Sequence, residues 1–313
     1  MLVRIIAFTF CFIINYGTSI EPTSILLTGG GYPYPNQEEI IGENKCNVSK
    51  IPTDYKYGHV MVLTAGDNKV LSCGGWGGSS SECLVLEPGR TWKHHSYLIR
   101  KRAYGVGISM PNGVYIFGGI DGPNADETLV TSDFLPAFSD KWEEGPVIPN
   151  SGIWAACGAK ISDTELVLIG GYDSKDRVLK FNTETGLWAK LANLNQGRHT
   201  HSCAFLNGNI IVAGGFDEFL IVESTEIISI SNGSPRLAGP MLVPRLYHSL
   251  ITYVDDQIPK VLAIGGYNKV ALSSIEVWNE TEEIWNTSSI SLDEPRMDFA
   301  ALALTPNLIC PNA

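Results

Sequence analysis

Short apolar runs that end in paired glycines recur along the whole chain. The runs read SILLTGG, VLSCGG, VYIFGG, LVLIGG, IIVAGG and VLAIGG. Runs of this length, bounded by turn residues, predict buried β-strands. The first glycines of successive pairs lie 45, 44, 52, 44 and 51 residues apart, and such a period predicts repeated supersecondary units. The six pairs are Gly29-Gly30, Gly74-Gly75, Gly118-Gly119, Gly170-Gly171, Gly214-Gly215 and Gly265-Gly266.

Each unit has room for four short antiparallel strands. Asn112-Gly113 and Asn207-Gly208 stand just ahead of two of the glycine strands, and Asn-Gly between apolar runs is a strong hairpin signal. Beyond the N-terminal segment, no stretch has convincing helical periodicity. Four-stranded units arranged radially form a β-propeller, so the pattern predicts an all-β chain of this architecture.

The two ends of the repeat array complement each other. The first glycine pair is preceded by a single strand at 24–31, whereas the segment at 296–304 resembles the first strand of a unit and has no glycine strand after it. We therefore expect the C-terminal strand to complete the N-terminal blade. Such pairing closes a six-bladed ring and leaves no exposed strand edge at the seam.

The glycine pairs occur together with Arg or His ahead of the first strand and Trp after the third, a pattern that resembles the kelch repeat over residues 24–304. Two units show it clearly, through Arg198-His-Thr-His201, Gly170-Gly171, Phe181 and Trp188, and through Arg245-Leu-Tyr-His248, Gly265-Gly266, Trp278 and Trp285. Arg102 with Trp142 and His59 with Trp92 fit more loosely, and Pro235 stands where one Trp is expected. WD40 repeats share the period, but the chain has no Trp-Asp dipeptide. The resemblance implies a six-bladed kelch-type β-propeller.

The first nineteen residues have the features of a secretory signal peptide. Arg4 precedes an almost wholly apolar run from Ile5 to Ile14, and Gly17 and Ser19 suit a small-residue cleavage site. The alternative, a membrane anchor, needs about 20 apolar residues. We expect residues 1–19 to be removed, residues 20–313 to form one secreted extracellular domain, and the mature chain to have no membrane span.

Charge and cysteine content agree with this localisation. Loss of Arg4 leaves 21 basic against 33 acidic residues, a net charge of −12, which argues against a nucleic-acid partner. Six cysteines remain after Cys11 is removed, and an even number in an exported chain favours disulfides. Six cysteines allow fifteen pairings, which the repeat register narrows. We expect Cys73 to bond with Cys83 across a hairpin and Cys157 with Cys203, which occupy equivalent places in adjacent repeats, and this leaves Cys46 for Cys310. Glycosylation sequons occur at Asn47, Asn232, Asn279 and Asn286.

Arginines and aromatic residues are expected to gather at one mouth of the central channel. In a blade with strands a to d, the d-to-a and b-to-c loops emerge on the same face. Arg binds carboxylates with two hydrogen bonds and aromatic rings offer stacking faces, so this mouth suits carboxylate, peptide or sugar ligands. The alternative is that these residues hold the blades together. The candidate ligand-binding residues are Arg102, Arg198, Arg245, Arg296, His201, His248, Trp76, Tyr172, Phe216 and Tyr267.

Histidines and aspartates at matching repeat positions are interpreted as structural. His59, His201 and His248 belong to different blades, so we assign no metal site. One Asp per Gly-Gly-x-Asp motif, as at Asp121, Asp173 and Asp217, suits a turn-stabilising role. Templates for hydrolases, phosphate-binding loops, zinc proteases, EF-hands and sialidases are absent. We therefore assign no catalytic residue and no cofactor.

The sequence thus predicts a secreted, disulfide-stabilised binding module that recognises an extracellular protein or glycan with one propeller face. One alternative is a small secreted enzyme that modifies sugars, comparable to the kelch-type sialic acid epimerases. Such an enzyme needs an acid–base pair at the channel mouth, from Asp173, Asp217 or Asp298, beside an arginine cluster. Another alternative is a structural component of the extracellular matrix.

Overall fold

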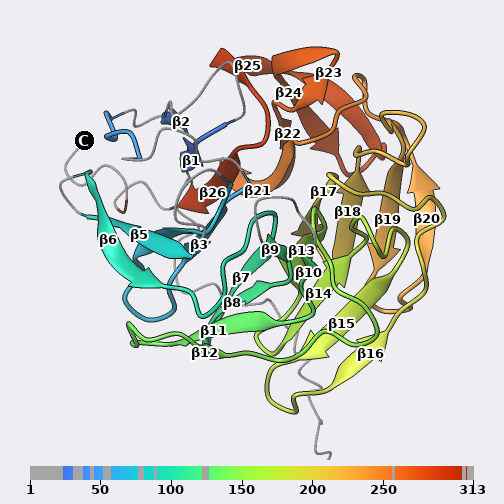
Figure 1. Cartoon of the computed structure of the whole chain (residues 1–313). Coiled ribbons are helices and arrows are strands. Elements are labelled where there is room, and N and C mark those ends of the chain that lie inside the picture. The colour runs from blue at the N-terminus through green and yellow to red at the C-terminus, as the bar shows by residue number, and fades with distance from the viewer. Residues whose placement is uncertain are drawn as a thin grey trace, which may run out of the picture.

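Six antiparallel sheets surround a central axis and form a six-bladed β-propeller (Figure 1). The computed structural model describes residues 24–30, 38–42, 46–51, 58–76, 81–87, 90–121, 127–255, 258–304 and 308. The predicted signal peptide, residues 1–19, lies outside the described residues. The all-β, six-bladed kelch-type architecture expected from the glycine repeats is confirmed.

Blades 1 to 4 have four strands each, hydrogen-bonded in neighbouring order. Blade 1 consists of β3 (Val60–Leu63), β4 (Val70–Cys73), β5 (Glu82–Leu86) and β6 (Trp92–Tyr97). Blade 2 consists of β7 (Val106–Met110), β8 (Gly113–Phe117), β11 (Ser132–Pro136) and β12 (Glu143–Glu144), with the small ribbon β9 (Ile120–Asp121) and β10 (Glu127–Thr128) beside it. Blade 3 consists of β13 (Cys157–Lys160), β14 (Glu165–Ile169), β15 (Val178–Asn182) and β16 (Trp188–Lys190). Blade 4 consists of β17 (Ser202–Leu206), β18 (Asn209–Ala213), β19 (Thr225–Ser229) and β20 (Pro235–Ala238).

Blades 5 and 6 complete the ring. Blade 5 consists of β21 (Ser249–Asp255), β22 (Ile258–Ile264), β24 (Val270–Asn279) and β25 (Ile284–Arg296), with β23 (Tyr267–Asn268) paired to β24. Blade 6 combines β26 (Ala300–Leu304) with β1 (Ser24–Thr28) and β2 (Glu39–Ile41). The pairing of β26 with β1 runs from Ser24 opposite Leu304 to Thr28 opposite Ala300. The predicted closure by the C-terminal strand is therefore confirmed.

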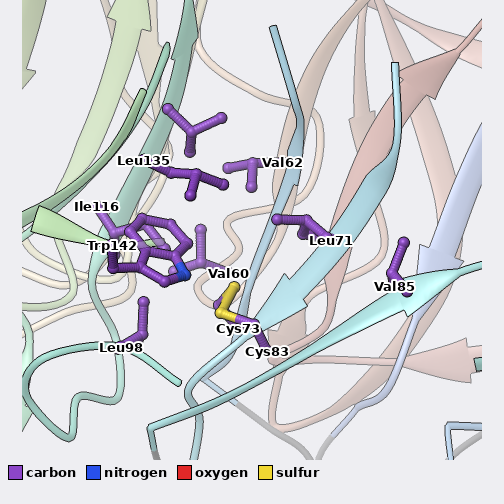
Figure 2. Close-up of a cluster of buried hydrophobic side chains, with 11 residues drawn as sticks. Val60, Val62, Leu71, Cys73, Cys83, Val85, Leu98, Ile116, Leu135 and Trp142 are labelled. Atoms are coloured by element: carbon purple, nitrogen blue, oxygen red, sulfur yellow. A yellow bond between two sulfur atoms is a disulfide. The ribbon is translucent and has the colours of Figure 1, made fainter. Parts of the chain in front are cut away.

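The first strand of every blade lies nearest the axis. β3, β7, β13, β17, β21 and β26 contact one another in turn around the ring, whereas the fourth strands lie at the rim (Figure 1). Apolar side chains from facing blades pack between the sheets. Figure 2 shows the layer between blades 1 and 2, where Trp142 lies with Val60, Leu71 and Leu135, and its Nε1 donates to the Ser96 hydroxyl at 3.0 Å.

A tryptophan is missing from the layer between blades 3 and 4, as the Pro235 substitution predicts. Blade 4 nevertheless keeps its fourth strand, which begins at Pro235. The buried cluster in this layer contains Ile210 and Ile228, together with the disulfide that joins Cys157 of β13 to Cys203 of β17. A covalent link between the two innermost strands thus holds together an interface that has no large aromatic side chain among its buried residues.

Two of the three predicted disulfides are confirmed. Cys73 and Cys83 face each other on β4 and β5 and are bonded, as are Cys157 and Cys203. Cys46 is also disulfide-bonded, whereas Cys310, its predicted partner, lies outside the described residues.

Among the residues that the structure describes, no helix is long and apolar enough to cross a membrane.

Candidate functional site

The loops ahead of each first strand lie beside the residues that follow the glycine pairs. Backbone bridges join Ala103 to Ile120, His199 to Phe216 and Leu246 to Tyr267. The two loop sets predicted to share one face therefore do so. We call this surface the axial face.

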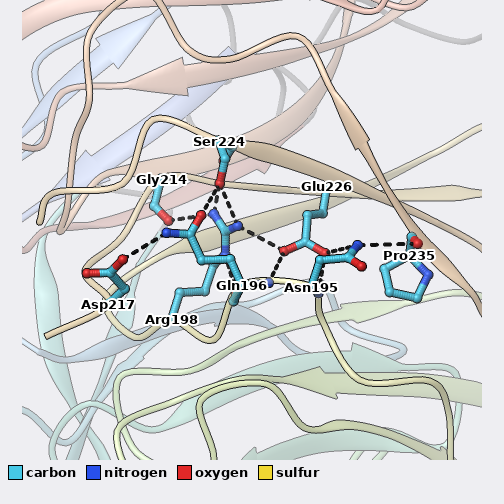
Figure 3. A network of polar contacts seen from close by, with 8 residues as sticks. All are labelled: Asn195, Gln196, Arg198, Gly214, Asp217, Ser224, Glu226 and Pro235. Carbon is cyan, nitrogen blue, oxygen red and sulfur yellow. Dashed lines mark hydrogen bonds and ion pairs between the residues drawn. The ribbon is translucent and has the colours of Figure 1, made fainter. Parts of the chain in front are cut away.

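The arginines at this face lie inside the blades rather than at an open mouth. Arg198 is completely buried, and its Nη2 donates to Glu226 Oε1 at 3.0 Å while its Nη1 donates to the carbonyl of Gly214 at 3.0 Å (Figure 3). Glu226 also accepts backbone N–H bonds from Asn195 at 2.7 Å and Gln196 at 3.0 Å. Burial lowers the pKa of the Arg198 guanidinium from its usual value, and the neighbouring Glu226 carboxylate partly offsets this effect.

The same arrangement, which we call the arginine clip, recurs in three other blades. A buried carboxylate from the third strand of the blade, or from β2 in blade 6, receives each guanidinium at 2.5 to 2.9 Å. These pairs are Arg102 with Asp133, Arg245 with Glu276, and Arg296 with Glu39. The clip ties the loop ahead of a blade to that blade's own sheet. Ligand binding by these four arginines stays a prediction, and their burial supports a structural role.

His201 and His248 act as spacers between blades. Both are buried, and a Cβ at Gly170 would lie 2.6 Å from Cε1 of His201. A Cβ at Gly214 would likewise lie 2.6 Å from Cε1 of His248. At the corresponding position of the next repeat, a Cβ at Gly265 would lie 3.0 Å from Cε1 of Phe299. Because Phe serves at this position, packing accounts for both histidines. Burial places the pKa of each well below its usual value, which keeps both rings neutral.

A ring of backbone hydrogen bonds surrounds the axis at the axial face. In blades 2 to 6, one loop residue with positive φ donates its N–H to the carbonyl of the equivalent residue in the preceding blade, at 2.7 to 3.0 Å. In blade 1, the N–H of Gly58 donates to the Asp298 carboxylate. We call these residues the axial ring: Gly58, Tyr104, Ala155, Thr200, Tyr247 and Asp298.

The large side chains of the axial ring gather on one side. Tyr104 reaches past Gly58 and donates its hydroxyl to Asp298 Oδ2 at 3.0 Å. Gly58 has to lack a side chain here, because a Cβ would lie 2.9 Å from the Tyr104 ring. Burial raises the pKa of Asp298 to about 6, although Tyr104 and the backbone N–H of Gly58 donate to its carboxylate. The pKa of Tyr247 is raised by burial and by the nearby charge of Asp298.

An arc of aromatic rings continues outward from the axial ring. Trp154 stacks on Tyr172 at a centroid distance of 4.7 Å and meets Tyr104 at 5.9 Å. His199 connects Tyr172 to Phe216, at 5.0 Å and 5.7 Å. The structure thus brings Tyr172 and Phe216 together. Trp76 and Tyr267 are partly exposed, and neither has a ring contact with the arc in the described part of the chain.

A shallow pocket of about 660 Å³ lies beside this arc. Its walls carry the acidic residues Asp173, Asp176 and Glu218, and Lys175, which forms an ion pair with Glu218. Asp217, next to the pocket, accepts the backbone N–H groups of Phe219 and Leu220 at 3.0 and 2.9 Å, so its predicted turn-stabilising role is confirmed. No group of three metal-ligating side chains occurs within the described ranges.

The comparisons with known proteins agree with this geometry. No protein-family model matches the chain. The chain is 24% identical to mouse Kelch-like protein 40 over 266 residues, which cover 77% of this chain and 40% of that protein. It is 26% identical to human Kelch-like protein 35 over 133 residues, covering 41% of this chain and 22% of that protein. The chain is a kelch-repeat β-propeller. It spans less than half of the length of either relative.

Blade 3 of this kelch propeller builds its clip in the opposite direction. Ile153 takes the place of the loop arginine, and Arg177, just ahead of β15, donates instead to the carbonyls of Pro149 and Ser151, both at 2.9 Å. The contact still ties the loop to the sheet. A repeat without the consensus arginine therefore keeps the function of the clip through another residue.

Sequence reasoning missed the carboxylates of the clips in this kelch propeller. A signal was present, because an acidic residue follows the first glycine of the pair by 10 to 15 positions in the four blades concerned. The axial ring was also missed, because no single residue type is common to its six members.

Three of the four predicted glycosylation residues are exposed, namely Asn47, Asn232 and Asn286. The fourth, Asn279, is partly buried.

Proposed function

We propose that this kelch propeller is a secreted binding module that recognises an extracellular protein or glycan with its axial face. The Kelch-like relatives and the propeller fold support a protein-interaction module. The observation that carries the proposal is the aromatic arc, since Tyr172 is 43% exposed although it is stacked on Trp154. Rigid, partly exposed rings bury a large area at low entropic cost, and aromatic residues are enriched in interfaces.

Secretion and glycosylation belong to the same proposal. The support is the N-terminal segment with Arg4 and its apolar run, the Cys73–Cys83 and Cys157–Cys203 disulfides, and the exposed sequon asparagines. Disulfides persist in oxidising compartments, which favours the extracellular localisation. Expression in a secretory host with and without residues 1–19, followed by mass spectrometry of the medium, tests this part.

The axial face is tested with a pair of aromatic variants. The purified chain is used for affinity capture from extracellular fluid and for a glycan array, and the ligand that it enriches is then titrated against both variants. We expect Tyr172→Ala to weaken binding at least tenfold. Phe138→Ala removes a ring that is 80% exposed on the loop between β11 and β12, at the opposite face, and should leave the affinity within twofold. Equal affinities for the wild-type chain and Tyr172→Ala would exclude the axial face.

A sugar-modifying activity is a second candidate, favoured by Asp298. Its raised pKa of about 6 and its contact with Tyr104 suit a group that exchanges protons near neutral pH. The arginines nearest to this site are held in their clips, so the arginine cluster required above is not formed by Arg102, Arg245 or Arg296. Deuterium incorporation from D₂O into acylated amino sugars, read by NMR, tests the activity, and Asp298→Asn should abolish it.

A further inference from the structure

Asp298 is the one charged member of the axial ring. The five other members are glycine, alanine, threonine and two tyrosines, and the Asp298 carboxylate accepts the N–H of Gly58 where the ring closes. Burial disfavours an ionised group unless it is paired. Asp298 receives hydrogen bonds from Tyr104 and Gly58, and no Lys, Arg or His among the described residues lies within ion-pairing distance of it. The site therefore has a partly buried negative charge without a described cationic partner.

Aromatic rings flank this carboxylate on both sides. Tyr247 precedes Asp298 around the ring, Tyr104 contacts it from the other side, and the two tyrosine rings lie 6.5 Å apart. Trp154 extends the aromatic wall next to Tyr104 at 5.9 Å. Asp298, Tyr104, Tyr247 and Trp154 all keep intermediate exposure. Solvent therefore reaches part of each of these four side chains. The remaining ring members Gly58, Ala155 and Thr200 have small side chains or none.

The electrostatic environment at the axial face favours a cation. The arginine guanidiniums are neutralised inside the clips, and His201 and His248 are kept neutral by burial. The neighbouring pocket has three acidic residues against Lys175, and the whole chain carries a net charge of −11. Aromatic faces beside a carboxylate are the surroundings in which organic cations bind, by cation–π attraction and a charge-assisted hydrogen bond.

We infer that Asp298, Tyr104, Tyr247 and Trp154 form a receptor for an alkylammonium group, supplied by an exposed lysine side chain of the protein partner. The inference rests on the proposed function and narrows the ligand at that same face. The ammonium donates to the Asp298 carboxylate and packs its methylene groups against the Tyr and Trp faces. A free amine offers the same chemistry, and the test separates the two sources.

The test is isothermal titration calorimetry on the full chain at pH 7.5 and constant ionic strength. The probes are n-butylammonium chloride, its neutral analogue n-butanol, Nα-acetyl-lysine methylamide and a lysine-containing peptide of the captured partner. We expect both amines and the peptide to bind and butanol not to bind. The peptide should bind at least tenfold more tightly than butylammonium if the source is a protein. Equal affinity for butanol and butylammonium overturns the inference, and a peptide no tighter than butylammonium overturns the protein source.

Two charge-removing variants provide the matched comparison. Asp298→Asn should weaken butylammonium binding at least tenfold and remain folded, since Asn tolerates the positive φ of 57° at this position. Asp163→Asn removes an exposed carboxylate on the loop between β13 and β14 and should change the affinity less than twofold. Wild-type affinity should also fall below pH 6 as the Asp298 carboxylate becomes protonated. Unchanged affinity in Asp298→Asn refutes the receptor, whereas unchanged partner binding in Tyr172→Ala refutes the proposed function instead.

Discussion

Replacing Asp298 by Asn should make the protein more stable at neutral pH. Burial raises the pKa of this carboxyl from its usual 3.8 to about 6, so folding favours the protonated form. At about 1.4 kcal/mol per pKa unit, the ionised carboxylate lowers the free energy of unfolding by about 3 kcal/mol. Asn keeps an acceptor for the Tyr104 hydroxyl and carries no charge. We therefore expect Asp298→Asn to raise the free energy of unfolding by about 2–3 kcal/mol at pH 8.

The raised pKa of Asp298 also determines how this stability difference changes with pH. The destabilisation by Asp298 is fully present above pH 6, decreases as the pH falls from 6 to 3.8, and is absent below 3.8. The advantage of the Asn variant should follow the same course. Urea unfolding at pH 8, 7, 6, 5 and 4, followed by tryptophan fluorescence and circular dichroism with disulfides intact, measures it.

An exposed carboxylate serves as the control for this series. Asp163→Asn should show no gain in stability at pH 8, because the salt bridge to Lys160 holds the Asp163 pKa below its usual value. The reasoning is refuted if Asp298→Asn is less stable than the wild-type chain at pH 8, or if the difference between them is the same at pH 8 and pH 4. Either result would mean that the ionised Asp298 is better satisfied than its surroundings indicate.

Two further predictions concern the repeat itself. Arg198→Met should lower the free energy of unfolding by about 3–5 kcal/mol, because it leaves Glu226 buried without its cation. Urea denaturation measures this change, and a decrease of less than about 1 kcal/mol would contradict the prediction. Gly170→Ala should lower the melting temperature more than Gly186→Ala does. Both glycines have positive φ, but only a Cβ at Gly170 would meet a neighbour, Cε1 of His201 at 2.6 Å. Equal melting temperatures for the two alanine variants would exclude this steric role.

The blade count, the closure and two disulfides were predictable because each leaves a mark in the sequence. Glycine pairs are needed where blades crowd together, as Gly170 against His201 illustrates. The incomplete ends at 24–31 and 296–304 required each other as partners. Such features depend on residue type, so a repeat in the sequence reveals them.

The geometry of the site was less predictable, for two physical reasons. A loop arginine repeats visibly, but its partner carboxylate sits at a different distance from the glycine pair in each blade, so Arg198 resembles a free ligand-binding group in sequence. The axial ring is built from backbone groups, and residues as different as Gly58 and Asp298 take part in it. A feature that depends on φ and backbone N–H groups, rather than on side-chain type, produces no sequence repeat.

The pairing of β1 with β26 has a consequence for how the chain acquires its structure. β1 is synthesised before blades 1 to 5, but its partner β26 is the last strand that the structure describes. Pairing across such a sequence separation is slow, because the entropy of loop closure is lost before the contacts form. Blades 1 to 5 can assemble as they are synthesised, whereas the apolar β1 stays without its partner until β26 has been synthesised. During that interval the edge of β1 that pairs with β26 is open and prone to aggregation, so a chaperone that covers it should assist folding.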